Sequence, residues 1–295
     1  MIEYGKEIKV AALIGKYRSP DVAESLRALS SFLRGRGIRV LIEQGTAESV
    51  GASGFDVASY EAIGTAADVA VVVGGDGTML HSARRLAEFD VPLVGVNQGR
   101  LGFMTDIASS DMIPSMEQLL AGHFTGERRP LLDAEVLRGG LRVFQTLALN
   151  DVVVNKGDIG RMIEMKVEVD GEFLYVLRAD GMIVATPTGS TAYALSANGP
   201  ILQPLVAGIA VVPLCPHALT YRPITISDES SVDLTLLAPH DGRVHFDGQA
   251  RFDARAGDCV RIVRAGHAIT LLHPPGYSYF AMLREKLHWS AFPKH

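Results

Sequence analysis

The sequence predicts two domains of different fold class, and three observations along the chain support them. Over residues 1–125, short apolar runs alternate with segments of helical spacing, which is typical of a parallel sheet with right-handed crossovers. From residue 126, short apolar strands separated by glycine turns follow, with one helical insertion at residues 190–197. Helical spacing returns within residues 276–295. We expect an α/β N-terminal domain with a Rossmann-like parallel sheet, an all-β, sandwich-like domain over residues 126–275, and a C-terminal helix that packs back on the first domain.

Size and composition fit a folded chain of this kind. The 295 residues suffice for two domains, and 47% hydrophobic with 21% charged residues is typical of globular proteins. The formal net charge is −5 and no basic block is present, so we do not expect nucleic acid as a partner. Cys215 and Cys259 lie far apart without metal-ligand spacing, which indicates reduced thiols. The first residues lack a signal region and no apolar run could span a bilayer, so we expect no membrane partner and a cytoplasmic location.

The spacing of apolar residues predicts the individual elements. A first helix should begin at Pro20 and end at Gly35 and Gly37, since apolar residues recur at helical spacing between them. The polar, glycine-rich stretch 44–56 is interpreted as a loop, followed by a short helix. The other helices of the first domain are expected at residues 78–89 and 112–121, and its strands at 8–14, 38–42, 70–73 and 92–96. Strands of the second domain are expected at 131–137, 141–149, 152–154, 163–169 and 173–177, with hairpin turns at Gly139-Gly140 and Asp170-Gly171.

The most informative stretch is residues 70–80, AVVVGGDGTML, in which a buried-strand pattern runs into glycines and then into helical spacing. Gly74, Gly75 and Gly77 would let the backbone turn sharply and let an anionic ligand approach. A helix beginning near Thr78 would direct free N–H groups and its positive dipole end at that ligand. Asp76 is unexpected there, because a carboxylate repels phosphate. It is either a general base or a residue that caps the helix or fixes the turn, and the loop alone favours neither.

Other candidate residues of the first domain follow its strands, at the sheet edge where open α/β folds bind ligands. Lys16 and Arg18 come after the first strand, and they either contact phosphate or are solvated loop charges. A second glycine-punctuated loop, residues 95–106, follows the strand at 92–96. Its Phe103 either borders a base or ribose or fills the core, and the sequence slightly favours the core.

Two polar motifs stand out in the second domain. Asn150 and Asp151 interrupt the run ALNDVVV, and they form either a turn or a pair that binds ribose hydroxyls. Residues 186–193, TPTGSTAY, carry five hydroxyl groups, too many for one helix cap, which favours a nucleotide site. Asp247-Gly248 is interpreted as a hairpin turn. His217 is a phosphate ligand or a structural histidine, and the sequence favours neither.

Several common motifs are missing from the sequence. There is no GxxxxGK[ST], which excludes a P-loop enzyme, and no GxSxG elbow. There is also no GxGxxG after the first strand, which argues against an ordinary Rossmann dehydrogenase.

Taken together, four segments of the chain resemble the NAD kinase family: GGDGT at 74–78, GVNQGRLGFMTD at 95–106, LNDVVV at 149–154 and DGMIVATPTGSTAY at 180–193. GGDGT alone is shared with lipid kinases, whereas the TPTGSTAY run combined with the Asn-acid pair is far more specific. The resemblance implies an enzyme that transfers the γ-phosphoryl group of ATP to the 2′-hydroxyl of the adenosine ribose of NAD, giving NADP. Mg²⁺ or another divalent cation would arrive with ATP.

The resemblance also implies roles for individual residues. Asp76 would be the general base that takes the proton of the ribose 2′-hydroxyl. Asn150 and Asp151 would bind ribose hydroxyls within an NAD-binding domain of residues 126–275. Arg178 and Asp180 would reach a dinucleotide held by a neighbouring subunit, since family sites lie at subunit contacts of homodimers or homotetramers. The other residues expected around the dinucleotide are Gly74, Gly75, Gly77, Thr78, Phe103, Thr188, Thr191, Ala192, Tyr193 and Ser196.

Two positions depart from the family pattern. Asp151 stands where the family usually has Glu, so the shorter acid would reach the ribose through water or bind it more weakly. Asn198-Gly199 replaces the usual Gly-Gly, a local change at a helix end. Arg at position 178 accompanies a preference for NAD over NADH and for ATP over polyphosphate in the family.

Two alternatives use the same residues differently. A lipid kinase acting on diacylglycerol or a sphingoid base could carry the GGDGT loop, but we find no apolar or basic segment suited to a membrane surface. A non-catalytic NADP-binding regulator would keep the pocket without needing Asp76.

Overall fold

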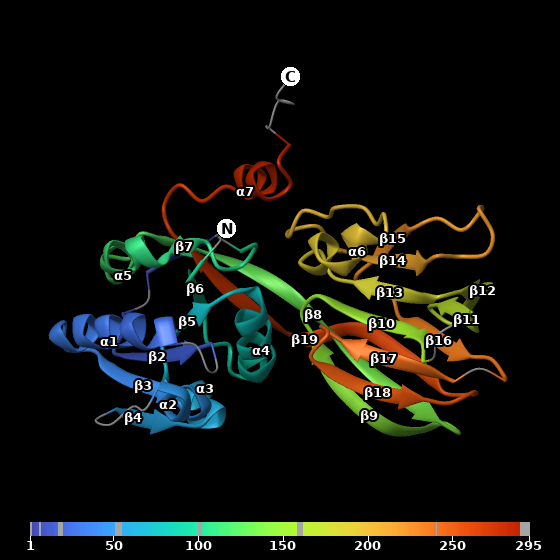
Figure 1. Ribbon diagram of the computed structural model, residues 1–295, viewed down its shortest axis with the longest axis horizontal. Helices are drawn as coiled ribbons and strands as arrows, with labels where there is room; N and C mark the ends of the chain where they lie inside the picture. The colour runs from blue at the N-terminus through green and yellow to red at the C-terminus, as the bar shows by residue number, and fades with distance from the viewer. Residues whose placement is uncertain are drawn as a thin grey trace. The chain divides into compact units, whose positions relative to one another are not determined.

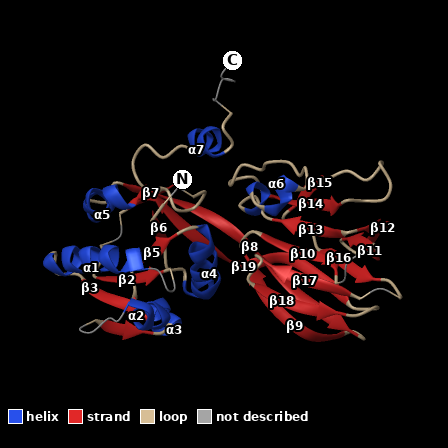
Figure 2. Ribbon diagram, in the orientation of Figure 1, coloured by secondary structure: helices blue, strands red, loops and turns tan. Residues whose placement is uncertain are grey.

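A computed structural model describes residues 2–5, 7–16, 20–50, 55–99, 102–157, 162–239 and 241–289 of the chain. The chain divides into two compact units, Met1–Arg128 with Ile269–His295, and Arg129–Ala268. Two long strands, β8 (Phe124–Arg138) and β19 (Cys259–His273), contribute residues to both units (Figure 1). The predicted fold class is confirmed, because helices and parallel strands make up the first unit and strands dominate the second (Figure 2). Arg18 lies outside the described residues.

The first unit is built on a parallel sheet with the strand order β6-β5-β2-β3-β4. All six residues of the central strand β5 are buried, including both alternating sets of side chains. That pattern is expected of a parallel strand covered on both faces. The end of β19 adds a parallel neighbour to β6 through Leu271 and Leu93. The strands are β2 (Val10–Gly15), β3 (Arg39–Glu43), β4 (Asp56–Ala58), β5 (Val69–Gly74) and β6 (Leu93–Asn97), with β7 (Ile107–Ala108) beside β6 and β1 (Ile2–Tyr4) beside β8.

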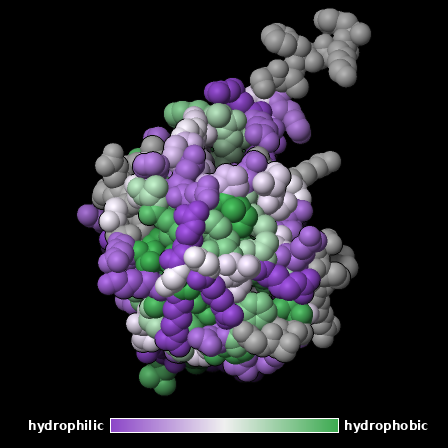
Figure 3. All heavy atoms as spheres, turned by 90° about the vertical axis from the view of Figure 1, so that its left-hand side faces the viewer, coloured by the Kyte–Doolittle hydropathy of each residue, from purple (hydrophilic) through white to green (hydrophobic). Residues whose placement is uncertain are grey.

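Helices cover this sheet largely as the sequence predicts. The four apolar residues of α1 at helical spacing, Val22, Leu26, Leu29 and Leu33, pack with β2, β3 and β5 in one core cluster. Met116 and Leu119 of α5 join the same cluster. On the face of this unit that Figure 3 shows, hydrophilic and hydrophobic side chains are interspersed. The helices are α1 (Pro20–Gly35), α2 (Gln44–Val50), α3 (Tyr60–Ala66), α4 (Asp76–Leu86), extended by the 3₁₀ turn η1 (Ala87–Phe89), and α5 (Met112–Leu120), preceded by the 3₁₀ turn η2 (Ser109–Asp111).

The interpretation of residues 44–56 as a loop is wrong over its first part, which is helix α2. The Glu43 carboxylate accepts the backbone N–H of Gly45 at 2.8 Å and that of Thr46 at 2.7 Å. It thereby satisfies two N–H groups that the first turn of a helix cannot bond by itself, and a negative charge at this end is also favoured by the helix dipole. Only Thr46 and Ala47 of this helix are buried, so the sequence carries little apolar periodicity to reveal it.

The second unit is a sandwich of antiparallel strands, as predicted. One sheet has the order β15-β14-β13-β10-β17-β18. The other contains β12-β11-β16-β19, and β8 pairs with β9. One buried cluster contains Val152 and Val154 from the first sheet together with Met165 and Val167 from the second. The strands are β9 (Leu141–Ala148), β10 (Asp151–Lys156), β11 (Ile163–Val169), β12 (Glu172–Ala179), β13 (Gly181–Ala185), β14 (Gly208–Leu214), β15 (Ile224–Ser227), β16 (Val232–Leu236), β17 (Gly242–Phe246) and β18 (Ala250–Ala254).

Three predicted hairpin turns are confirmed. Each joins two neighbouring antiparallel strands, β8 to β9, β11 to β12, and β17 to β18. Both named residues have positive φ in every case, between 53° and 80°, which is the conformation of the two central residues of a type I′ turn. The loop between β17 and β18 contains a third residue, Gln249. The turns are Gly139-Gly140, Asp170-Gly171 and Asp247-Gly248.

Two shorter helical features complete the fold. The insertion expected at residues 190–197 is a 3₁₀ turn, η3 (Gly189–Thr191), followed by the single-turn helix α6 (Tyr193–Ser196). The expected C-terminal helix is α7 (Tyr279–Lys286), and the Ser278 side chain caps it by accepting the N–H of Ala281 at 3.3 Å. It belongs to the same unit as the parallel sheet. A helix long and apolar enough to cross a membrane is not found in the described part of the chain.

Candidate active site

The GGDGT loop is the turn between β5 and α4. Gly75 is the N-cap of α4 and Asp76 its first residue, so the helix begins two residues before the predicted start at Thr78. The expectation of a sharp, glycine-specific turn needs correction, because none of these three glycines has a positive φ in the structure. The glycines instead leave space where another residue would place a Cβ. A Cβ on Gly74 would lie 2.6 Å from Thr78 Oγ1, whereas the sites of a Cβ on Gly75 and Gly77 are open for 4 Å.

The Asp76 carboxylate is held by the second glycine-punctuated loop. Its Oδ2 accepts the N–H of Phe103 at 2.8 Å, and its Oδ1 accepts the N–H of Met104 at 3.0 Å and the hydroxyl of Thr105 at 3.2 Å. The carboxylate therefore points to residues 103–105 and does not cap its own helix. Gly102 makes this approach possible, since a Cβ there would collide with Asp76 Oδ1 and Thr105 Oγ1.

The three hydrogen bonds leave one lone pair of the Asp76 carboxylate for a further donor. An ionised carboxylate has about four lone-pair positions, and the three hydrogen bonds occupy one on Oδ2 and two on Oδ1. Asp76 is also the first residue of an 11-residue helix, so it lies at the helix end where phosphate groups bind favourably. Among the described residues, Asp76 thus combines an anchored geometry with a lone pair on Oδ2 that accepts no hydrogen bond.

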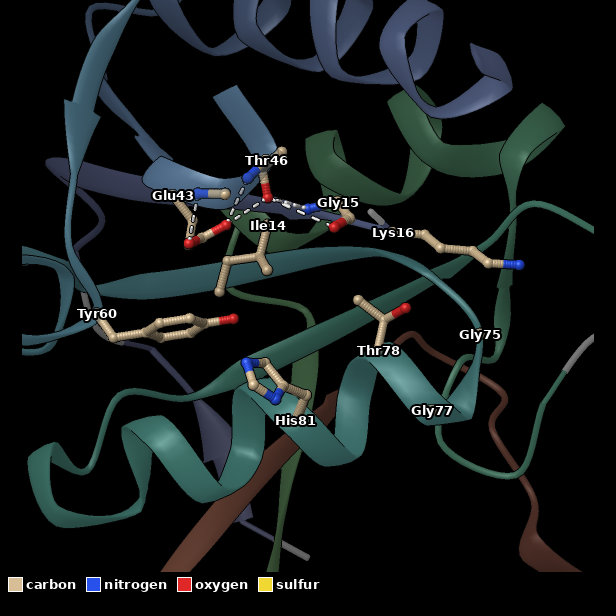
Figure 4. Close-up of a pocket in the computed structure, with 11 residues that line it drawn as sticks. Ile14, Gly15, Lys16, Glu43, Thr46, Tyr60, Gly75, Gly77, Thr78 and His81 are labelled. Atoms are coloured by element: carbon tan, nitrogen blue, oxygen red, sulfur yellow. Dashed lines mark hydrogen bonds between the residues drawn. The ribbon is translucent and has the colours of Figure 1, made fainter. Parts of the chain in front are cut away.

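A cavity of about 590 Å³ lies beside this loop in the first unit. Figure 4 shows Gly75, Gly77, Thr78 and the Lys16 side chain toward one end, and Tyr60 and His81 toward the other. Thr46 forms part of the wall, where its hydroxyl donates to Glu43 Oε2 at 2.7 Å and accepts the N–H of Gly15 at 2.9 Å (Figure 4). The lining residues are Ile14, Gly15, Lys16, Glu43, Gly45, Thr46, Tyr60, Gly75, Gly77, Thr78 and His81.

The aromatic end of this cavity presents uncharged groups. Burial raises the pKa of Tyr60 to about 12, so its phenol stays protonated at neutral pH. Burial, and then the positive charges of Arg84 and Arg85, lower the pKa of His81. The cavity therefore offers a cation and a helix N-terminus at one end and neutral rings at the other.

A second cavity, of about 390 Å³, lies within the second unit. It brings together four predicted residues, Asn150, Asp151, Ala192 and Tyr193, and adds three polar residues that the sequence reading missed as site residues. Those three are Asn155, His245 and Asp247. Strand periodicity could have pointed to Asn155, since residues 151, 153 and 155 of β10 share one face, and His245 is paired with Val153 on the neighbouring strand.

Asp247 organises one wall of this second cavity. Its carboxylate accepts three consecutive backbone N–H groups, from Leu149 at 2.9 Å, Asn150 at 2.7 Å and Asp151 at 3.1 Å. The hairpin-turn interpretation is correct for its backbone, but the turn also carries a side chain that fixes the predicted ribose-binding pair. Burial, and then the charge of Asp247, raise the pKa of Asp151 to about 7.

Most hydroxyls of the TPTGSTAY loop build the loop itself, which corrects the expectation that they are offered to a ligand. Thr186 donates to the Leu149 carbonyl at 2.5 Å, and Ser190 donates to the Pro187 carbonyl at 2.6 Å. Thr188 accepts from buried Arg129 at 3.1 Å, and Thr191 donates to the carbonyl of Thr188 at 3.1 Å. Tyr193 differs, since it is 48% exposed and lines the cavity.

Comparison with known proteins identifies the family. The profile of the ATP-NAD kinase N-terminal domain matches residues 12–124, and that of the C-terminal domain matches residues 149–273. The NAD kinase of Aromatoleum aromaticum is 66% identical over 290 residues, covering 98% of this chain and 97% of that protein. The NAD kinase of Thiobacillus denitrificans is 52% identical over 277 residues, covering 94% of this chain and 96% of that protein.

The chain belongs to the ATP-NAD kinase family. This confirms the resemblance and decides against the lipid kinase alternative. Among solved structures, yeast NADH kinase complexed with NADH shares the fold, with a TM-score of 0.90 at 23% identity over 99% of this chain and 91% of that chain. An NAD kinase from Archaeoglobus fulgidus in complex with ATP has a TM-score of 0.75 at 25% identity, covering 95% of this chain and 98% of that chain.

Several residues expected from the family resemblance lie away from the two cavities. Asp180 forms an ion pair with Lys156 at 2.7 Å, and the exposed Arg178 lies 3.9 Å from Glu164. Ser196 is exposed at the end of α6. Phe103 is half-buried, so it does not fill the core as the sequence slightly favoured. His217, Thr188, Thr191 and Ser196 are likewise outside the described lining of either cavity.

Residues of this chain do not by themselves suggest a preformed metal cage. No group of three or more His, Cys, Asp or Glu side chains suited to a metal ion occurs among the residues described. Mg²⁺ commonly binds through substrate phosphates and one or two carboxylates.

Proposed function

We propose that Asp76 is the general base in the reaction of this kinase, the ATP-dependent phosphorylation of NAD to NADP. The observation that carries the proposal is the Asp76 carboxylate itself, anchored by residues 103–105 with a lone pair left on Oδ2. A secondary alcohol near neutral pH is a weak nucleophile, and a positioned base contributes roughly 10²–10⁴-fold to such a reaction. Asp76 supplies that base beside a glycine loop suited to phosphate.

Oδ2 of Asp76 takes the proton of the 2′-hydroxyl on the adenosine ribose of NAD. The freed oxygen forms a bond to the γ-phosphorus of ATP, the bond from that phosphorus to the β-γ bridging oxygen breaks, and ADP leaves. The products are NADP, ADP and a proton on Asp76, which solvent then removes. Mg²⁺, when bound with ATP, would neutralise phosphate charge.

The cavity of the first unit suits the phosphoryl donor. Its Gly75, Gly77 and Thr78 belong to the N-terminus of α4, where backbone N–H groups favour phosphate, and Lys16 adds a positive charge. Tyr60 and His81 provide neutral, partly apolar surfaces of the kind that contact a nucleobase. The related kinase from Archaeoglobus fulgidus was solved with ATP, which supports ATP as the donor here.

The cavity of the second unit suits NAD. Asn150 and Asp151 would hold ribose hydroxyls, and Ala192 and Tyr193 would contact a base. Thr188, Thr191 and Ser196 belong to the same loop and helix. Residues 126–275 would form the NAD-binding domain, and residues 1–125 with 276–295 the domain of the GGDGT loop. Yeast NADH kinase was solved with NADH, which supports a dinucleotide as the acceptor.

The remaining expectations concern the assembly and its setting. Arg178 and Asp180 are exposed or half-exposed on the surface of the second unit, which is compatible with contact to a dinucleotide of a neighbouring subunit. We propose a homodimer or homotetramer in the cytoplasm, without nucleic acid or membrane as a partner. Size-exclusion chromatography with light scattering would give the number of subunits.

The test of this function is a coupled assay of NADP formation from NAD, ATP and Mg²⁺. Asp76→Asn should lower kcat by roughly 10²–10⁴-fold, because an amide cannot take the proton. Calorimetry of NAD binding, together with the melting temperature, shows whether the variant keeps its pocket and fold. Turnover near that of the unmodified enzyme would refute the assignment of the base.

A further inference from the structure

A buried His-Asp pair lies directly behind the loop that holds Asp76. His273 is the last residue of β19 and is 1% exposed, and Asp106 follows Thr105 in the chain. The distance from His273 Nδ1 to Asp106 Oδ2 is 2.8 Å. Since an ionised carboxylate only accepts hydrogen bonds, the histidine donates Nδ1–H to it. The pair connects the end of β19 to a segment that is 167 residues away in sequence.

The His273 ring is also fixed in orientation. It stacks on the ring of Tyr277, with centroids 3.7 Å apart and planes 6° from parallel. The stacking holds the plane of the ring, and the hydrogen bond to Asp106 selects the orientation in which Nδ1 faces that carboxylate. The stacking and the hydrogen bond together make the pair a rigid link.

The pair of His273 and Asp106 lowers the free energy of unfolding, because it leaves buried polar atoms without hydrogen bonds in the described part of the chain. His273 Nε2 and Asp106 Oδ1 are both buried, and neither has a hydrogen-bond partner among the described residues. Leaving a buried polar atom unpaired costs about 1–3 kcal/mol, so an apolar pair of similar size would satisfy this position better. The arrangement is more easily understood as a means of fixing geometry than as a means of raising stability.

The geometry that the link fixes is that of the Asp76 clamp. Residues 102–105 form a tight turn in which Gly102 donates its N–H to the Thr105 carbonyl at 3.0 Å. Thr105 Oγ1 accepts from Asn97 at 2.9 Å, which fixes the turn from the side of β6. The bond from His273 to Asp106 fixes the next residue of the chain, so both bonds hold the C-terminal end of the turn. The two N–H groups and the hydroxyl aimed at Asp76 come from the three residues directly before Asp106.

We propose that His273 is a positioning residue for the kinase reaction: through Asp106 it holds the 102–105 turn so that Asp76 keeps its Oδ2 lone pair in the productive direction. The proposal rests on the proposed function of Asp76. His273 lies outside the described lining of both cavities and is buried, so it acts through the turn and not on the substrates. A misplacement of a catalytic group by about 1 Å can cost about 10²-fold in rate.

Three substitutions of His273 separate the hydrogen bond from the stacking. In His273→Asn the amide nitrogen stands close to the position of Nδ1, so it can still donate to Asp106. In His273→Gln the amide nitrogen stands close to the position of Nε2 and cannot. His273→Phe keeps a ring to stack on Tyr277 but has no donor. Exposed His267, changed to Asn, is the control for a histidine substitution on the same strand.

The experiment measures kcat and KM for NAD in the full chain, with hydrogen exchange of the peptide that covers residues 102–106. We expect His273→Phe and His273→Gln to lower kcat about 10–100-fold with little change in KM, and to speed exchange of the Phe103 and Met104 N–H groups. His273→Asn should retain most of the activity and protection. If the Phe and Gln variants do not fold, Asp106→Ala breaks the link from its other side with the same expected result.

Other outcomes overturn the proposal. Equal losses in all three variants would mean a general structural role, and unchanged exchange would mean that the link does not hold the turn. Faster exchange with unchanged kcat would mean that the turn does not position the base. Failure of the proposed function is recognised separately, by normal turnover of Asp76→Asn, which involves no change at His273.

Discussion

Asp76 in the first unit and Asp247 in the second each hold a distant segment of the chain by hydrogen bonds, but their surroundings suit them to different roles. Asp76 accepts two backbone N–H groups and a hydroxyl from residues 103–105, and Asp247 accepts three backbone N–H groups from residues 149–151. Each carboxylate holds a distant segment that carries predicted site residues. Hydrogen-bond counts alone therefore do not distinguish a general base from an anchor.

The surroundings of the two carboxylates distinguish them. Asp76 starts an 11-residue helix next to Gly75 and Gly77, whose backbone is open toward a cavity suited to phosphate. Asp247 has a positive φ of 53° in the hairpin turn between β17 and β18 and lines a cavity with Asn150 and Tyr193. The comparison teaches that an aspartate can be assigned a role only together with the groups it faces.

The same substitution, aspartate to asparagine, tests whether Asp76 and Asp247 have different roles. Asp76→Asn should lower kcat by roughly 10²–10⁴-fold, since the base is lost. Asp247→Asn should leave kcat within a few-fold and raise KM for NAD about tenfold, because an amide group would weaken the bonds that fix Asn150 and Asp151. Steady-state kinetics with NAD varied at saturating ATP measures both. Similar losses of kcat in the two variants would mean that Asp247 takes part in the chemistry.

The glycine behind Asp76 gives a second contrast. A Cβ on Gly102 would collide with Asp76 Oδ1, so Gly102→Ala should displace the turn or the carboxylate and lower kcat about 10²-fold. Gly99→Ala is the matched control from the same loop, because the nearest atom to its Cβ would be Asn97 Oδ1 at 3.9 Å. The NADP-formation assay measures both variants. Equal activity of the two would show that the Asp76 clamp is not needed.

The buried acid beside Asp247 predicts a pH effect on stability. The pKa of Asp151 is raised from 3.8 to about 7 in the folded chain, so the folded state binds more protons than the unfolded state between these values. The contribution of Asp151 to stability therefore falls as pH rises from about 4 to about 7. Asp151→Asn removes the ionisation and should stabilise the ligand-free protein by about 4 kcal/mol at pH 8 and by about 1 kcal/mol at pH 4.5.

Urea unfolding of both proteins at the two pH values measures this difference. A stability gain that is the same at pH 4.5 and pH 8 would contradict it. The double variant Asp151→Asn with Asp247→Asn sharpens the test, because the charge of Asp247 is the second cause of the raised pKa. The gain from Asp151→Asn should be smaller once Asp247 is uncharged.

The smallest expected effect concerns the loop hydroxyls that hold the Asp247-fixed segment from its other side. Thr186 donates to the Leu149 carbonyl and accepts the N–H of Gly189 at 3.1 Å, so Thr186→Val leaves buried groups unpaired. It should cost about 1–2 kcal/mol of unfolding free energy. Thr65→Val, at an exposed position in α3, should change stability by less than about 0.5 kcal/mol. Thermal denaturation measures both, and equal shifts would contradict the prediction.

Local pattern was sufficient for much of the fold. The apolar spacing from Val22 to Leu33 gave α1, and the paired turn residues such as Asp170-Gly171 gave the hairpins, because both depend on near neighbours in the chain. Helix α2 escaped this reasoning, since it is stabilised by the Glu43 carboxylate and not by an apolar face.

The candidate site divides in the same way. The sequence was enough to propose the site residues, because the glycine loop around Asp76 and the pair Asn150 and Asp151 are local motifs that can be recognised without the fold. Only the tertiary structure decided what those residues face. The partners of Asp76 are 27 to 29 residues away and those of Asp247 are 96 to 98 residues away, so only folding brings these donors to these carboxylates.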